Sequence, residues 1–138
     1  MRSIVIDTNV IIAALKSRLG ASNKLLTLIG MKKFELNIST ALLLEYEDVI
    51  KRLMKNFAIN QVDTFLDYIC LESRHINISY LWRPVLKDPN DELVLELAVA
   101  AKADYIITYN KKDFFGVEKF GIKTLSPKEF LQLIGEIK

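Results

Sequence analysis

Four acidic side chains occupy positions from which carboxylates can meet at one edge of a sheet: Asp7, Glu45, Asp91 and Asp113. Asp7 directly follows the apolar stretch 4–6, and Asp113 lies just past the apolar stretch 104–110. Carboxylates gathered in one cleft raise each other's pKa, and a hard divalent cation removes that penalty. Because Mg²⁺ and Mn²⁺ prefer oxygen ligands, these residues favour metal-assisted hydrolysis of a phosphodiester.

Each acidic residue also has an ordinary structural explanation. Asp7 or Asn9 is a good N-cap for the helix that follows the first strand. Asp88 precedes Pro89, a pair typical of the N-cap and first position of a helix, and Asp91 then lies in the first turn, where it favours the helix dipole. The other two carboxylates suit a solvated helix face and a turn. Only their joint placement favours a site.

The elements expected to position these residues alternate between strand and helix. The stretch 4–6 is β-branched and uninterrupted by polar residues, which is typical of a strand buried on both faces. Further strands are expected at 34–39, 75–79 and 104–110, and helices at 40–56, 60–72, 88–103 and 126–137. This alternation predicts an α/β fold, a three-layer α/β/α sandwich with a central parallel sheet of four or five strands.

Composition is that of an ordinary globular protein. The chain has 138 residues, 51% of them hydrophobic, without repeats or a Pro/Gly-rich linker, which predicts a single domain over 1–138. No apolar run is long enough to span a bilayer, and Asp7 interrupts any signal-like pattern, so a cytoplasmic protein is expected. Cys70 is the sole cysteine, which excludes an internal disulfide and a cysteine-based metal cluster.

Several other chemistries are excluded by what the chain lacks. His75 is the only histidine, so a ribonuclease that uses two histidines as acid and base is excluded, and His75 is expected to be partly buried or structural. Ser39 has no histidine partner for serine-hydrolase chemistry. The chain contains neither a P-loop nor a GxGxxG motif. Cys70 is expected in the core.

Basic and aromatic residues near the acidic positions offer contacts for a nucleic acid. The formal net charge is only +2, but it becomes more positive when the four carboxylates are set apart. The basic residues closest in sequence are Lys51, Arg52, Lys55, Lys111 and Lys112, with Lys32 and Lys33 further away. They suit phosphate contacts or ordinary solvation equally well. Tyr109, Phe114 and Trp82 are candidates for stacking on bases, although core positions are the commoner explanation for Phe114 and Trp82.

With these motifs in view, the sequence resembles the PIN-domain family, the fold of Mg²⁺-dependent ribonucleases. The opening IVIDTNVIIAAL matches the first strand of that family with its Asp-Thr-Asn. STALLLEYEDVI matches the second acidic position, DPNDELVLELAVAAKADYIIT the third, and TYNKKDF the fourth. The resemblance extends over the whole chain and is greatest to prokaryotic VapC-like toxins of toxin–antitoxin pairs.

The resemblance implies a role for each matching residue. Asp7 and Asp91 are the implied metal ligands for Mg²⁺ or Mn²⁺. Glu45 is expected to bind the metal through water or to help deprotonate the attacking water, and Asp113 completes the ring of carboxylates. The supporting residues are Asn9, Ser39, Thr108 and Asn110. Some PIN nucleases carry Asp where this chain has Asn110, so the sequence leaves open whether one or two ions bind.

The function implied is that of an endoribonuclease with an RNA substrate and an antitoxin protein as partner. The helices at 40–56 and 60–72 display more apolar surface than a small sheet covers, with Phe57, Tyr68 and Leu71 left over, so a homodimer is expected. The alternative is a catalytically weak PIN-like binding module that acts through RNA or a protein partner. The retained carboxylates oppose this alternative, because they repel RNA unless a cation is bound.

Overall fold

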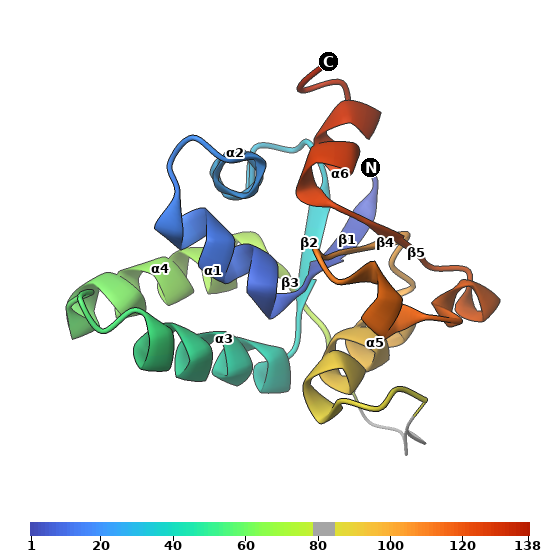
Figure 1. The fold of residues 1–138 in the computed structure, drawn as a ribbon, viewed down its shortest axis with the longest axis horizontal. Helices are drawn as coiled ribbons and strands as arrows, with labels where there is room; N and C mark the ends of the chain where they lie inside the picture. Colours follow the sequence, from blue (N-terminus) through green and yellow to red (C-terminus); the bar gives the residue numbers. More distant parts are fainter. Residues whose placement is uncertain (79–84) are drawn as a thin grey trace.

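The computed structural model describes residues 1–78 and 85–138 (Figure 1). Within these ranges five strands form one parallel sheet in the order β3-β2-β1-β4-β5. The strands are β1 (Ser3–Ile6), β2 (Glu35–Ile38), β3 (Arg74–His75), β4 (Tyr105–Ile107) and β5 (Lys123–Leu125). The predicted α/β class with a parallel sheet of four or five strands is confirmed.

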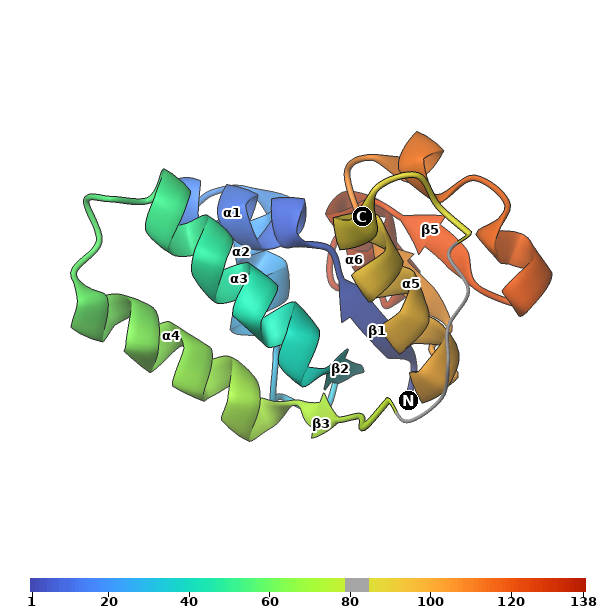
Figure 2. The same ribbon diagram turned by 90° about the horizontal axis from the view of Figure 1, so that it is seen from below.

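Helices cover both faces of this sheet. They are α1 (Thr8–Lys16), α2 (Ala21–Thr27), α3 (Thr40–Leu53), α4 (Ile59–Glu72), α5 (Pro89–Ala101) and α6 (Pro127–Leu133), with 3₁₀ turns η1 (Lys111–Phe114) and η2 (Val117–Phe120). Figure 2 shows β1 between α5 on one side and the group of α1 to α4 on the other. The chain therefore has the three layers that the alternating pattern predicted.

The central strand forms the middle of the core. Ile4, Val5 and Ile6 are fully buried, because β2 and β4 flank β1 while helices cover both of its faces. Ile6 lies opposite Ile107 in the parallel register, so the residues that follow β1 and β4 leave the sheet side by side. This register determines which polar groups meet at the carboxyl edge.

Four elements differ from the expectation. Helix α2 and strand β5 were not predicted, because α2 is short and polar at its start, and β5 is a partly exposed edge strand of three residues. The strand expected at 75–79 is only Arg74–His75, and residue 79 lies outside the described ranges. His75 is exposed on this edge strand rather than partly buried, but its ring Nε2 lies 3.2 Å from the Cys70 carbonyl oxygen, which fits the structural role expected as the other possibility. Helix α6 ends at Leu133 rather than near 137.

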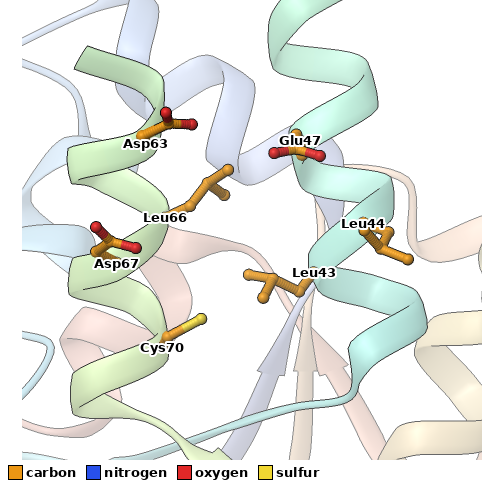
Figure 3. A pocket seen from close by; sticks show the side chains of 7 residues that line it. All are labelled: Leu43, Leu44, Glu47, Asp63, Leu66, Asp67 and Cys70. Atoms are coloured by element: carbon orange, nitrogen blue, oxygen red, sulfur yellow. The ribbon is translucent and has the colours of Figure 1, made fainter. Parts of the chain in front are cut away.

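Helices α3 and α4 lie side by side with a groove of about 320 Å³ between them (Figure 3). Leucines form its apolar part, three acidic side chains line it as well, and Cys70 lines it from α4. Cys70 is thus only partly buried, and burial together with nearby Asp67 raises the pKa of its thiol. The groove contains none of the predicted site residues.

The apolar side chains expected to be left over on α3 and α4 have different surroundings. The Tyr68 hydroxyl lies within hydrogen-bond distance of the carbonyl oxygens of Leu26 and Ile29, at 3.1 and 2.7 Å. Phe57 packs against the core, whereas Leu71 is 81% exposed. Of the residues that suggested a dimer, only Leu71 remains uncovered.

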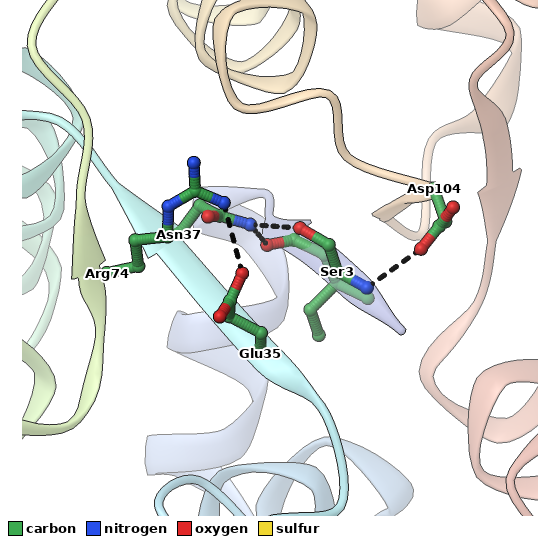
Figure 4. Close-up of polar contacts among 6 residues, drawn as sticks. Ser3, Glu35, Asn37, Arg74 and Asp104 are labelled. Carbon is green, nitrogen blue, oxygen red and sulfur yellow. Dashed lines mark hydrogen bonds and ion pairs between the residues drawn. The ribbon is translucent and has the colours of Figure 1, made fainter. Parts of the chain in front are cut away.

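Polar contacts tie the strands together away from the carboxyl edge (Figure 4). The Asn37 amide donates to the Ser3 hydroxyl at 2.7 Å and to the Ile4 carbonyl at 3.0 Å. The Ser3 amide donates to Asp104 at 2.9 Å, and Arg74 pairs with Glu35 at 3.2 Å. These bonds hold β1, β2 and their neighbours in register. No helix in the described part of the chain is long and apolar enough to cross a membrane.

Candidate active site

Asp7 lies at the end of β1 and is the N-cap of α1. Its Oδ1 accepts a hydrogen bond from the Thr8 amide, and its Oδ2 accepts one from the Thr108 hydroxyl, both at 2.8 Å. The side chain is only 8% exposed. The capping explanation is therefore confirmed for Asp7, and it leaves the carboxylate at the edge of the sheet, where a site is expected.

Thr108, which follows β4, connects Asp7 to two asparagines. Its hydroxyl oxygen accepts from the Asn110 amide at 3.0 Å and from the Asn9 side chain at 3.5 Å, while its own proton goes to Asp7. The Asn9 side-chain oxygen in turn accepts from the Tyr109 amide at 3.5 Å. Three of the four predicted supporting residues thus form one network around Asp7.

All four predicted carboxylates line one cavity of about 350 Å³ at this edge. The predicted residues that line it are Asp7, Asn9, Glu45, Asp91, Asn110 and Asp113. Thr108 is fully buried and hydrogen-bonded to Asp7. Ser39 is not among the lining residues. Its hydroxyl caps α3 by accepting from the Leu42 amide at 3.1 Å, and it lines a separate cavity beside Ile76.

Asp88 also lines this cavity, although the sequence indicated only a helix cap for it. It does cap α5, because its side chain accepts from the Asn90 amide at 2.8 Å. Since α5 begins at the same sheet edge, Asp88 and Asp91, three residues apart, both lie on the cavity. The three-residue spacing of these two aspartates was the feature of the sequence that could have indicated that both line the cavity. Arg52, predicted only as one of several basic residues, provides a cation in the lining.

Burial and mutual repulsion raise the pKa of the carboxyl groups here. For Asp7, burial is the largest cause, opposed by the Thr108 and Thr8 hydrogen bonds and increased by Asp113 and Asp88. Burial raises the pKa of Glu45 as well, with Asp48 and Asp88 adding to it and Arg52 opposing it.

The largest effect is on Asp91. Burial, followed by the charges of Asp7, Asp88, Asp113 and Glu92, raises the pKa of Asp91 to about 7. The site therefore holds more negative charge than its surroundings stabilise, which is the electrostatic condition that a cation relieves.

The sequence profile of the PIN domain matches residues 3–112 of this chain. The chain belongs to the PIN-domain family. PIN domains are generally nucleases and generally use divalent metal ions. The family predicted from the four motifs is thus confirmed.

One solved structure shows the same fold across nearly the whole chain. It is the crystal structure of VapBC2 from Rickettsia felis bound to a DNA fragment from their promoter. The TM-score is 0.62 at 18% identity, and the match covers 90% of this chain and 99% of that one. No curated protein matches the sequence. At this identity the similarity shows that the two chains share a fold.

The donor groups of this PIN domain fit a hard divalent cation. They are carboxylate and amide oxygens, partly buried, and burial together with neighbouring carboxylates raises the pKa of Asp7 and of Asp91. In residues 1–78 and 85–138, however, no three acidic, histidine or cysteine side chains form a group tight enough to hold an ion. The described carboxylates thus line one cavity, but they do not lie close enough together to form a complete set of metal ligands.

The basic and aromatic residues of this PIN domain have varied surroundings. Arg52 lines the carboxylate cavity and also pairs with Asp48 at 4.0 Å, and Lys112 lines an adjoining cavity. Three lysines form ion pairs elsewhere: Lys33 with Glu136, Lys51 with Glu47 and Lys111 with Glu129. Phe114 is buried, which confirms a core position and excludes it from stacking on bases. Tyr109 is half exposed, with its hydroxyl bonded to Ser22. Trp82 lies outside the described residues.

Proposed function

We propose that this PIN domain is a Mg²⁺- or Mn²⁺-dependent endoribonuclease that hydrolyses RNA phosphodiester bonds as the toxin of a toxin–antitoxin pair. The observation that carries the proposal is the convergence of Asp7, Glu45, Asp91 and Asp113 on one cavity, where burial and then repulsion by neighbouring carboxylates raise the pKa of Asp91 to about 7. A protein that only bound RNA would gain repulsion from these groups.

Asp7 and Asp91 are the proposed metal ligands, because they lie at the ends of different elements and face the same cavity. When bound, a divalent cation supplies Lewis-acid chemistry, lowering the pKa of the attacking water and stabilising the leaving oxygen. Thr108 holds the Asp7 carboxylate in one orientation through its 2.8 Å hydrogen bond. Asp113 contributes further negative charge to the same ring.

Glu45 is the proposed proton acceptor for the attacking water. Its pKa is raised by burial and by Asp48 and Asp88, which makes its carboxylate a better base near neutral pH. Arg52 lines the same cavity and opposes that rise, so its guanidinium is placed to contact a substrate phosphate. Asn9 and Asn110 offer amide groups for orienting water or phosphate.

The proposed partners are RNA, an antitoxin and a second copy of the chain, acting in the cytoplasm. The structure of similar fold is named as VapBC2 with promoter DNA, which supports a paired protein as partner. The alternative function, a catalytically weak binding module, is favoured by Asn110 and by the loose grouping of carboxylates in the described residues.

The decisive experiment measures cleavage of labelled single-stranded RNA by the purified chain with Mg²⁺ or with a chelator. We expect cleavage only with Mg²⁺, and a loss of at least about 100-fold in Asp7→Asn, because a ligand that Thr108 orients is removed. Asp67→Asn, on the groove between α3 and α4, is the matched control and should cleave normally.

Full activity of Asp7→Asn would refute the proposed metal site. RNA binding without cleavage under any divalent cation would instead favour the binding module. Since both variants are prepared alike, a contaminating ribonuclease would leave their activities equal.

A further inference from the structure

A second cavity, of about 490 Å³, adjoins the carboxylate cavity and shares three acidic residues with it. The shared residues are Asp88, Asp91 and Asp113, and the other lining residues are Val85, Leu86, Lys87, Lys112 and Phe115. Carboxylates, an aromatic ring, aliphatic side chains and two lysines therefore meet in one hollow. This mixed lining suits a ligand that is flat and apolar in one part and anionic in another.

Phe115 is the aromatic ring of this cavity, and it is 88% exposed. It follows η1, which directs its neighbour Phe114 into the core. A single exposed apolar side chain needs no explanation on its own. This one lies beside the proposed catalytic carboxylates, where a free aromatic face can bind a base.

The aliphatic wall of the cavity is fixed to the helix that carries Asp91. The amides of Val85 and Leu86 both donate to the Glu92 carboxylate, which is only 8% exposed on α5. Asp91 and Glu92 are adjacent in the first turn of α5. The wall and the proposed metal ligand are therefore held by the same helix turn, so their separation is constrained.

Two lysines supply positive charge beside the carboxylates of this cavity, and each directly precedes one of them in the chain: Lys87 precedes Asp88, and Lys112 precedes Asp113. Lys111 is paired with Glu129, but neither Lys87 nor Lys112 forms an ion pair within the described ranges. Both are exposed, so each can reach a phosphate at the rim of the cavity. Phosphate contacts of this kind position a nucleic acid without reading its sequence.

We propose that this cavity binds the unpaired base of a nucleotide next to the scissile phosphate, with Phe115 stacking on the base and Lys87 and Lys112 contacting flanking phosphates. The inference rests on the proposed ribonuclease function and adds to it a binding site for one unpaired base beside the carboxylate cavity. A base within a duplex is covered by its stacked neighbours and cannot present its face to Phe115.

The test uses equilibrium binding of a short fluorescein-labelled single-stranded RNA, with Mg²⁺, in the Asp7→Asn background. Phe115→Ala should weaken binding about 10-fold, whereas Phe115→Tyr, which keeps a ring, should stay within about two-fold. Leu19→Ala removes a fully exposed apolar side chain that lines neither of these two cavities and should change nothing.

A single abasic site, moved along the RNA, identifies the contacted nucleotide. At one position the abasic RNA should lose about 10-fold in affinity with Phe115 present and show no further loss with Phe115→Ala. A structural role for Phe115 would not produce this coupling. Lys112→Gln should weaken all RNAs alike and reduce the salt dependence by about one counterion.

Equal abasic penalties in the Phe115 and Phe115→Ala proteins would refute this inference, even if the wild type cuts RNA. Preserved coupling with no cleavage by the wild type in any divalent cation would refute the proposed enzyme while leaving the base site in place. Preferred binding of duplex RNA, or of no RNA at all, would contradict the cavity's assignment to an unpaired base.

Discussion

Asp91 is the carboxyl group of the site whose protonation changes near neutral pH. Its pKa is raised from 3.8 to about 7, so in the metal-free protein about half of the molecules carry a proton there at pH 7. Because a cation competes with that proton, its binding should strengthen as pH rises through this range. The same shift affects stability.

The free energy of unfolding should fall as pH rises from about 4 to about 7 in the absence of metal. Across this window folded Asp91 holds a proton that the unfolded chain has released, so the slope of stability against pH is negative. Asp91→Asn removes the penalty. We expect its Tm to exceed that of wild type by a few degrees at about pH 8, with the difference vanishing at about pH 4.

Thermal unfolding in a chelator measures this effect. Asp67→Asn controls for the general loss of one negative charge, because Asp67 lies outside the carboxylate cavity. An equal gain at both pH values, or in the control, would mean that the repulsion around Asp91 is not the cause.

Helix α3 shows what spacing in the sequence can and cannot predict. Its apolar spacing accounts for the burial of Tyr46 beside Leu42, Val49 and Ile50, but that spacing says nothing about where the phenolic hydroxyl binds. That hydroxyl donates to the carbonyl of Ile6, the residue directly before Asp7. A core residue of α3 therefore helps to fix the end of β1, from which the site begins.

Tyr46→Phe should lower the free energy of unfolding by about 1–3 kcal/mol, because the Ile6 carbonyl is left buried with one partner fewer. It should also slow RNA cleavage several-fold through displacement of Asp7. Tyr68→Phe is a matched control, since it too removes a hydroxyl bonded to backbone carbonyls, but far along the chain from the site.

Denaturant unfolding and initial cleavage rates measure the two effects. Loss of stability in both variants with loss of activity only in Tyr46→Phe supports the role of Tyr46 in positioning Asp7. Parallel losses of activity would show that instability alone is responsible.

Elements with strong patterns were predictable, and short ones were not. Apolar strands and polar caps indicated β1, β4 and the start of α5, because burial and capping act on neighbouring residues. Strand β5 could not be predicted from its own residues, because it forms by pairing with β4. The direction of each side chain in and after η1 likewise depends on tertiary packing and not on the local sequence. The sequence correctly favoured a core position for Phe114, but it gave no indication that Phe115 is the exposed ring.

The strand order explains why the site lies where it does. From β1 the chain continues through α1 and α2 to β2 on one side, while β4 on the other side is reached through α5. Connections that leave neighbouring strands in opposite directions open a crevice at their carboxyl ends. Asp7 and Thr108 lie at that point, so four carboxylates distant in sequence meet without any local motif containing them all.

The whole chain is expected to form a homodimer through α3 and α4. The exposed apolar side chains available for this contact are Leu44 and Leu53 on α3 and Ile59 and Leu71 on α4. Light scattering at micromolar concentration should give twice the mass of the chain, and Leu71→Asp should give a monomer. A wild-type monomer would contradict this expectation. The partial burial of Phe57 and Tyr68 already reduces the support for it.

The last prediction concerns which nucleophile attacks the RNA. The only histidine, His75, lies on the exposed edge strand β3 and does not line the carboxylate cavity, so the residues of that cavity favour attack by water over attack by the ribose 2′-hydroxyl. RNA carrying a 2′-O-methyl group at the scissile nucleotide should therefore still be cut, at a rate reduced only by the altered fit. The products should carry a 5′-phosphate and a 3′-hydroxyl, which mass spectrometry distinguishes from a 2′,3′-cyclic phosphate. Cyclic products formed in a chelator, together with resistance of the methylated RNA, would show that the carboxylates do not perform the chemistry assigned to them.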